Sequence, residues 1–171
     1  YEVGVYDAEY DWRYLGRTGT YEYALTHQHL IDEARTDRNH HVWGEIKGVI
    51  ERFAPDLVGI SAMTNKYPMA ERIAEIAKSI DPTIPVVLGG HHPSLYGEKL
   101  IRNRNIDFVV RGEGELTMAE LVSRLFKPEK NFSGVGGLLY KDKGEIRANP
   151  PRELIQDLDL LPIPNRDLVL N

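Results

Sequence analysis

The sequence predicts an α/β protein of the flavodoxin-like (Rossmann-like) class, built on a doubly wound parallel sheet. Short apolar runs rich in β-branched residues occur at 57–62, 85–90 and 106–111, and each stops abruptly in small or polar residues. Such continuous runs are typical of strands buried on both faces of a parallel sheet. Segments with helical spacing alternate with them, which indicates right-handed crossovers. Ligands of such sheets bind beyond the carboxyl ends of the strands, so function is expected there.

Composition excludes several classes of protein. The 171 residues suffice for one domain, and 42% hydrophobic with 27% charged residues is ordinary for a globular chain. A net charge of −5 provides no broad basic field for nucleic acid, and no apolar run is long enough to span a membrane. The absence of cysteine excludes a disulfide, a thiolate zinc site and a cysteine-held iron–sulfur cluster in this chain. It also favours a cytoplasmic location.

The amino-terminal residues predict a strand that starts at once. Tyr1 to Asp7 alternate apolar and polar side chains. Because a natural chain seldom begins inside a strand, the sequence is expected to be part of a longer protein. The aromatic segment 8–39 follows, and it is too long for a simple connector. A helix is expected around 21–33.

Four further helices are predicted from apolar residues that recur on one face. They cover 40–53, a segment ending at Asp81, about 94–103, and about 115–126. The residues that mark the clearest three are Val42, Trp43, Ile46, Val49, Ile50 and Phe53, then Met69, Ile73, Ile76, Ala77 and Ile80, then Met118, Leu121, Val122, Leu125 and Phe126. With the three strands they give the β-α-β-α-β-α order of a doubly wound sheet.

The carboxyl-terminal part has a different pattern. Apolar runs at 137–140 and 145–147 flank a glycine turn, which predicts a β-hairpin. Beyond Pro151 the apolar residues lose any period, as in an extended connector towards another domain. The predicted organisation is therefore an α/β domain over 1–133, a hairpin over 134–149 and a linker over 150–171.

The candidate site begins where the first of the three strands ends, at Ser61-Ala62-Met63-Thr64. The hydroxyl of Ser61 can hydrogen-bond a ligand edge, and Ala62 leaves room for it. The ordinary alternative is a turn in which Thr64 or Asn65 caps the next helix.

Paired glycines, Gly89 and Gly90, close the next strand. They remove side chains where a backbone meets a ligand or where φ must be positive, although glycine after a strand is also common turn chemistry. A side chain at either position is expected to fill ligand space, and Gly90→Leu is expected to leave the fold intact.

Two imidazoles, His91 and His92, follow the glycines and could bind metal or donate to a ligand. Adjacent residues on a strand or turn usually point apart, and no third ligand stands at zinc spacing, so no metal-binding or catalytic residue is predicted. The third strand ends at Gly112-Glu113-Gly114, which lacks the Lys and Ser/Thr of a phosphate loop. Its acidic residues either favour the amino end of the next helix or suit a ligand with amide or hydroxyl donors.

Taken together, these segments resemble the cobalamin-binding domain that precedes the radical S-adenosylmethionine domain in cobalamin-dependent radical enzymes of the methyltransferase or anaerobic cyclase type. The resemblance covers roughly Leu57 to Leu168. It rests on an ordered set of motifs: Ser61-Ala62-Met63, the run Gly89-Gly90-His91-His92-Pro93-Ser94, residues 110–117, Gly137-Leu138-Leu139-Tyr140, Asn149-Pro150 and residues 155–167.

The resemblance implies a cofactor-binding role for the strand ends. Ser61 would contact the buried nucleotide tail of cobalamin, and the glycine pair would let that tail pass. The implied cofactor-binding set is Ser61, Ala62, Met63, Thr64, Gly89, Gly90, His91, His92, Gly112, Glu113 and Gly114. The same comparison makes Tyr1–Asp7 the second strand of the fold. The first strand and its loop, which carries Asp-x-His-x-x-Gly in proteins that ligate cobalt through His, would then be missing.

The implied parent transfers a methyl group from methylcobalamin to an unactivated carbon or phosphorus centre, and it carries a [4Fe–4S] cluster and S-adenosylmethionine in a radical domain outside this chain. An anaerobic cyclase is a variant of this architecture. Without its first strand the chain is expected to lack cobalamin, and residues 1–6 are expected to pair unusually or to detach from the sheet. Two alternatives remain open: a flavodoxin-like module for another nucleotide-type ligand or for protein docking, and a small metal-dependent hydrolase using His91 and His92.

Overall fold

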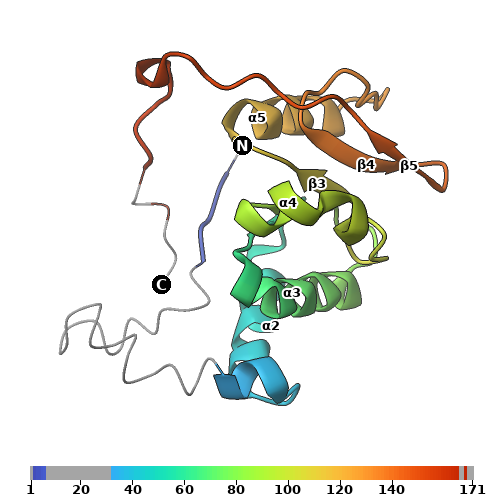
Figure 1. Cartoon of the computed structure of the whole chain (residues 1–171). Coiled ribbons are helices and arrows are strands. Elements are labelled where there is room, and N and C mark those ends of the chain that lie inside the picture. Colours follow the sequence, from blue (N-terminus) through green and yellow to red (C-terminus); the bar gives the residue numbers. More distant parts are fainter. Residues whose placement is uncertain (1, 7–31, 166–167, 169–171) are drawn as a thin grey trace. The chain divides into compact units, whose positions relative to one another are not determined.

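A computed structural model describes residues 2–6, 32–165 and 168 of the chain (Figure 1). The chain divides into two compact units, one of Tyr1–Ala54 with Asp159–Asn171 and the other of Pro55–Leu158. The candidate site lies in the second unit, which contains all three of the predicted parallel strands.

The second unit is built on one sheet of five strands in the order β1-β2-β3-β4-β5. The strands β1 (Val58–Ser61), β2 (Val86–Gly89) and β3 (Phe108–Val110) are parallel, which confirms the predicted α/β fold. The predicted hairpin, β4 (Leu138–Asp142) and β5 (Glu145–Ala148), joins the same sheet, antiparallel to β3. It covers the backbone groups that β3 would otherwise leave unpaired at an edge.

Three helices follow the parallel strands, as predicted. They are α3 (Tyr67–Ile80), α4 (His91–Leu100) and α5 (Glu115–Leu125), and a short 3-10 turn, η2 (Thr64–Lys66), precedes α3. A second 3-10 turn, η3, covers Leu158–Leu160. Among them α4 corrects the prediction, because it starts at His91 rather than near Ser94. Pro93 falls in its first turn, where proline costs no intrahelical hydrogen bond.

The two faces of the sheet are covered differently. The helices α3 and α4 pack against β1, β2 and β3 on the face of Ile60 and Val109. On the other face α5 packs over β3 and β4, and Figure 1 shows α4 and α5 on either side of β3. The cluster beneath α5 contains Val87, Phe108, Val110, Leu121, Leu125, Val135, Leu138 and Tyr140.

At the amino-terminal edge of the sheet, where the parallel strands begin, two lysines and a carboxylate hold the strand ends together. Lys78 Nζ lies 2.7 Å from Asp107 Oδ2, and the same carboxylate oxygen accepts the backbone N–H of Val86 at 2.8 Å. Lys141 Nζ donates to the carbonyls of Asn103 and Ile106, each at 2.6 Å. Burial lowers the pKa of Lys141 from its ordinary value. Charged groups thus fix strand ends that lie far from the candidate site along the sheet.

The first unit contains a helical stretch over residues 32–36 and the predicted helix α2 (His41–Phe53). His40 caps α2 by accepting the backbone N–H of Val42. The predicted amino-terminal strand is not formed over residues 2–6, where Val5 makes only a single bridge, its N–H donating to the carbonyl of Leu168 at 2.8 Å. The aromatic residues at 8–31 and most of the helix expected at 21–33 lie outside the described residues. Within the described part of the chain, no helix is long and apolar enough to cross a membrane.

Candidate functional site

The ends of β1 and β2 bring the first two predicted motifs together. Ser61 pairs in register with Gly89, and Gly59 pairs with Val87 two residues earlier. Because side chains alternate along a strand, Gly59, Ser61 and Gly89 share one face. Gly59 and Ser61 are exposed, whereas Ile60 between them is buried on the face covered by α3. We call Gly59, Ser61 and Gly89 the small-residue strip, and it leaves the sheet surface open at its carboxyl end.

Gly90 is required by the fold itself. Its φ is +98°, and a Cβ added there would lie 2.9 Å from both Ala62 N and Ser61 Oγ. The backbone of Ala62, directly after β1, therefore occupies the place of a side chain, which only glycine allows. The expectation that a side chain at Gly90 would leave the fold intact is wrong. At Gly89, by contrast, an added Cβ would meet only Val110 Cβ, at 3.9 Å.

The turns after β1 and β2 are joined by hydrogen bonds. Ala62 N donates to Gly89 O at 2.9 Å, and His92 N donates to Ala62 O at 3.1 Å. Thr64 Oγ1 lies 3.2 Å from Nδ1 of His92. The alternative role of Thr64 or Asn65 as a helix cap is not found, because neither η2 nor α3 has a side-chain cap. Thr64 instead links the two turns.

His92 is also stacked with aromatic rings. Its centroid lies 4.8 Å from that of Tyr67 and 4.7 Å from that of Tyr96, with interplanar angles of 35° and 39°. Tyr67 begins α3, and Tyr96 lies one turn after His92 on α4. The neighbouring His91 is exposed on the first turn of α4, and Met63 is 59% exposed in the preceding loop. The two imidazoles thus have different surroundings.

Ser94 connects the turn after β2 to the turn after β3. Its hydroxyl donates to Gly90 O at 2.9 Å and accepts the N–H of Gly112 at 2.9 Å. Gly112 adopts a φ of +73°, while Gly114 precedes α5 with a φ of −89°. Glu113 Oε2 accepts the backbone N–H of Ile155 at 3.1 Å. The predicted acidic turn is therefore hydrogen-bonded on one side to the site and on the other to the segment after the hairpin.

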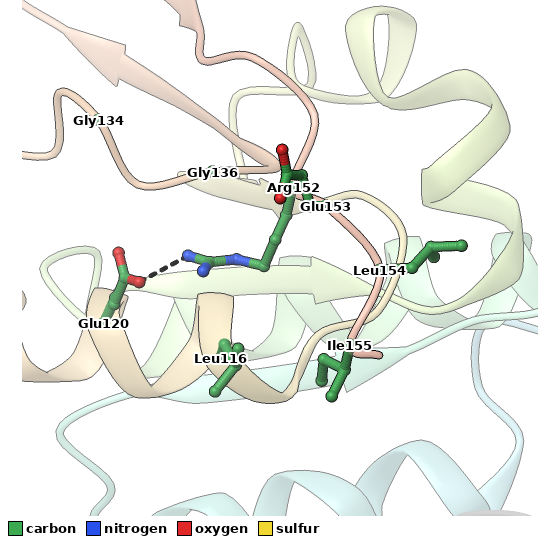
Figure 2. Close-up of a pocket in the computed structure, with 8 residues that line it drawn as sticks. All are labelled: Leu116, Glu120, Gly134, Gly136, Arg152, Glu153, Leu154 and Ile155. Atoms are coloured by element: carbon green, nitrogen blue, oxygen red, sulfur yellow. Dashed lines mark hydrogen bonds and ion pairs between the residues drawn. The ribbon is translucent and has the colours of Figure 1, made fainter. Parts of the chain in front are cut away.

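That segment, residues 150–155, is attached to α5 by Arg152. Nε of Arg152 donates to Thr117 Oγ1 at 2.9 Å, and its Nη2 lies 2.8 Å from Glu120 Oε1. Thr117 is fully buried and donates to Gly136 O at 2.8 Å. Figure 2 shows Arg152 pointing to Glu120 above a cleft of about 440 Å³. The cleft is lined by Leu116, Glu120, Gly134, Gly136, Arg152, Glu153, Leu154 and Ile155. None of the predicted site residues lines this cleft.

The structure thus collects most of the predicted residues at one edge of the sheet. Ser61, Ala62, Thr64, Gly89, Gly90 and His92 are joined directly, and Gly112 and Glu113 are joined to them through Ser94. Sequence reasoning missed Tyr67, Tyr96 and Arg152, which belong to no recognisable motif. It also assigned no role to Ser94, although Ser94 lies in the run Gly89–Ser94. Among the described residues, no group of three His, Asp or Glu side chains could hold a metal ion. The metal-dependent hydrolase therefore gains no support here.

Comparison with known proteins adds a family. The model of the B12 binding domain matches residues 29–122. An uncharacterized methyltransferase of Pyrococcus horikoshii is 45% identical over 128 residues, which are 74% of this chain and 28% of that protein. An anaerobic magnesium-protoporphyrin IX monomethyl ester cyclase of Rubrivivax gelatinosus is 37% identical over 121 residues, 67% of this chain and 21% of that protein. The chain therefore spans less than a third of either relative.

Solved structures show the same fold at lower identity. The radical S-adenosylmethionine methyltransferase TsrM of Kitasatospora setae matches with a TM-score of 0.57 and 19% identity, over 81% of this chain and 28% of that one. The cobalamin-dependent S-adenosylmethionine radical enzyme OxsB, solved with aqua-cobalamin and S-adenosylmethionine bound, matches with a TM-score of 0.55 and 23% identity, over 66% of this chain and 16% of that one.

Proposed function

The chain belongs to the B12-binding domain family, and from this membership we propose that it binds cobalamin within a radical S-adenosylmethionine methyltransferase. The small-residue strip carries the proposal. Gly59 and Ser61 are exposed on β1, which is an edge strand of the described sheet, and nothing lies within 4 Å of a Cβ added at Gly59. A sheet surface without side chains suits a flat ligand that must approach the backbone closely.

The residues of this edge have distinct roles in the proposal. Ser61 hydrogen-bonds the nucleotide tail of cobalamin, and Gly59 and Gly89 leave space for that tail. Ala62, Met63, Thr64 and Gly90 shape the turn beside it, and His91, His92, Gly112, Glu113 and Gly114 form the neighbouring turns. When bound, cobalamin supplies a cobalt centre able to carry a methyl group. The chain's own residues bind and orient the cofactor.

The parent protein is proposed to hold the rest of the reaction. Two relatives are named as a methyltransferase and a cyclase, and the greater identity favours the methyltransferase. The cyclase is the second candidate, on the strength of its 37% identity. The partner of this domain would be a radical domain of the same protein, with a [4Fe–4S] cluster and S-adenosylmethionine, working in the cytoplasm. The gene should then encode a motif of three closely spaced cysteines beyond Asn171, which sequencing will test.

The binding test uses the full-length gene product, reconstituted with hydroxocobalamin under anaerobic conditions. The unaltered protein should retain cobalamin through gel filtration and show its absorption bands. Gly89→Leu should abolish retention, because the leucine would fill the strip, and its Cβ would meet only Val110 Cβ, at 3.9 Å. Gly44→Leu is the matched control, since Gly44 is exposed on α2 and nothing lies within 4 Å of its added Cβ.

Two results would contradict the proposal. If the Gly89→Leu variant retained cobalamin, the cofactor would not bind at the small-residue strip. An unaltered protein that retains a flavin or another nucleotide instead of cobalamin would support the alternative of a different flavodoxin-like binding module.

A further inference from the structure

We propose that His92 is a positioning residue for the cobalamin site, acting through Thr64 rather than by contact with cobalt. This inference rests on the proposed function and assigns how the turn after β1 keeps its shape. That turn, residues 61–66, presents Ser61 to the ligand. It has no capping side chain of its own, since neither η2 nor α3 is capped. Inside the turn, Lys66 N donates to Met63 O at 3.0 Å, and further contacts that hold its conformation come from outside the turn.

The backbone provides the first of these contacts. Gly90 lies so close to β1 that an added Cβ would come within 2.9 Å of Ala62 N. His92 N then donates to Ala62 O at 3.1 Å. Both contacts hold the start of the turn, next to Ser61, and neither reaches Thr64.

The side chain of His92 provides the contact at the far end of the turn. The hydrogen bond between Nδ1 and Thr64 Oγ1, at 3.2 Å, spans 28 residues of sequence and joins the β1–α3 turn to the first turn of α4. One residue thus holds the turn twice, by its backbone at Ala62 and by its ring at Thr64.

The ring itself is fixed by two tyrosines. Tyr67 at the start of α3 and Tyr96 on α4 contact the ring of His92, at centroid distances of 4.8 and 4.7 Å. The hydroxyl of Tyr67 donates to Glu71 Oε1 at 3.4 Å, which ties that ring to α3. Tilted aromatic contacts of this kind orient a ring as well as stabilise it. With its Nδ1 bonded to Thr64, His92 is arranged as a support for the turn, in contrast to the exposed His91.

The test is a double-mutant cycle on the affinity of the full-length gene product for hydroxocobalamin. His92→Phe keeps an aromatic ring and removes Nδ1, and Thr64→Val removes the hydroxyl at constant shape. Each should weaken binding about two- to fivefold, the range expected for one partly exposed hydrogen bond. The double variant should be no weaker than either single one, because both remove the same bond. Glu98→Ala, at an exposed position on α4, should leave affinity unchanged.

Two further measurements separate positioning from other roles. Thr64→Ser keeps a hydroxyl, so it should preserve affinity when His92 is present, and it should fail to restore affinity in the His92→Phe protein. The visible spectrum of bound cobalamin should be the same in His92→Phe and in the unaltered protein, because no cobalt ligand is lost.

The outcomes are distinguishable. Additive losses in the double variant, or a changed cobalamin spectrum in His92→Phe, would overturn the positioning role while leaving the proposed function intact. Failure of the unaltered protein to bind hydroxocobalamin would overturn the proposed function and this inference with it. A parallel loss of affinity and of thermal stability in both single variants would show that the bond maintains the fold in general, and it would overturn the inference as well.

Discussion

The two edges of the sheet in the Pro55–Leu158 unit are held together by different kinds of interaction. At the amino-terminal edge, Lys78, Asp107 and Lys141 make short charge-assisted bonds, and the side chain of Lys78 is only 13% exposed. At the carboxyl-terminal edge, Thr64, His92 and Ser94 join the turns through hydrogen bonds of 2.9 to 3.2 Å that involve no carboxylate or ammonium group. Charge-assisted bonds are roughly twice as strong as neutral ones.

This contrast indicates where the domain is firm and where it is adaptable. The charge-assisted bonds at the amino-terminal edge should keep the strands in register even when contacts at the carboxyl-terminal edge are lost. The carboxyl edge can then carry exposed polar groups and side-chain-free backbone, which stabilise little but are accessible to a ligand. The Arg152 network on α5 is intermediate, since it is charge-assisted but lies beside the turn of Glu113.

The largest expected effect comes from a change at the carboxyl edge, where most contacts are weak. Gly90→Leu requires a positive φ and puts a Cβ within 2.9 Å of the backbone of Ala62. It should lower the free energy of unfolding by roughly 3 kcal/mol or more, from the sum of left-handed strain and overpacking. Urea denaturation measures this loss. Gly89→Leu should cost far less, and equal losses for the two variants would show that Gly90 is not specially constrained.

The next effect concerns the amino edge. Asp107→Ala leaves Lys78 without its carboxylate and Val86 N without its acceptor. We expect a loss of about 2 kcal/mol in the free energy of unfolding, from a partly buried ion pair and a hydrogen bond. Glu145→Ala is the control, because its pair with Arg147 is exposed, and it should cost at most about 0.5 kcal/mol. Affinity for hydroxocobalamin should stay unchanged in both, and a large loss in Asp107→Ala would mean that the two edges are coupled.

A smaller effect tests the segment after the hairpin. Arg152→Lys keeps the charge but cannot bond Thr117 and Glu120 together, since a lysine has no planar fork. We expect a loss of about 1 kcal/mol in the free energy of unfolding. Hydrogen exchange at the Ile155 amide, which donates to Glu113, should become faster. Exchange that stays as slow as before would show that Glu113 alone holds the segment.

The smallest effect appears only at alkaline pH. Burial, and next the carboxylate of Glu71, raise the pKa of the Tyr67 phenol above its ordinary value of 10.0. Above that pH the unfolded chain loses this proton before the folded one, so the free energy of unfolding should fall as pH rises further. A tyrosinate absorbance titration should lose one late-titrating group in Tyr67→Phe. Loss of a group that titrates at or below 10 would contradict the shift.

Much of the candidate site could be predicted because local patterns determine it. The glycine pair and the polar residues after β1 and β2 were identified from where apolar runs stop, and parallel pairing then placed Ser61 beside Gly89. The start of α4 could not be placed correctly, because His91, His92 and Pro93 have no apolar period that predicts a helix. The role of Thr64 was equally hidden, since a hydroxyl after a strand can cap a helix or bond a distant turn.

The α/β alternation, the hairpin, the strand ends and the resemblance to cobalamin-binding domains could all be read from the chain alone, because they follow from residue types at short spacing. Three other features are seen only in the folded structure. The hairpin extends the sheet, and the end of β1 packs where a side chain at Gly90 would lie. His92, Ser94 and Glu113 make hydrogen bonds between segments that are distant in the sequence. Each of these depends on groups far apart in the chain that meet only after packing. Hydrogen-bond partners and close backbone contacts are set by distance in space, which short-range sequence patterns do not encode.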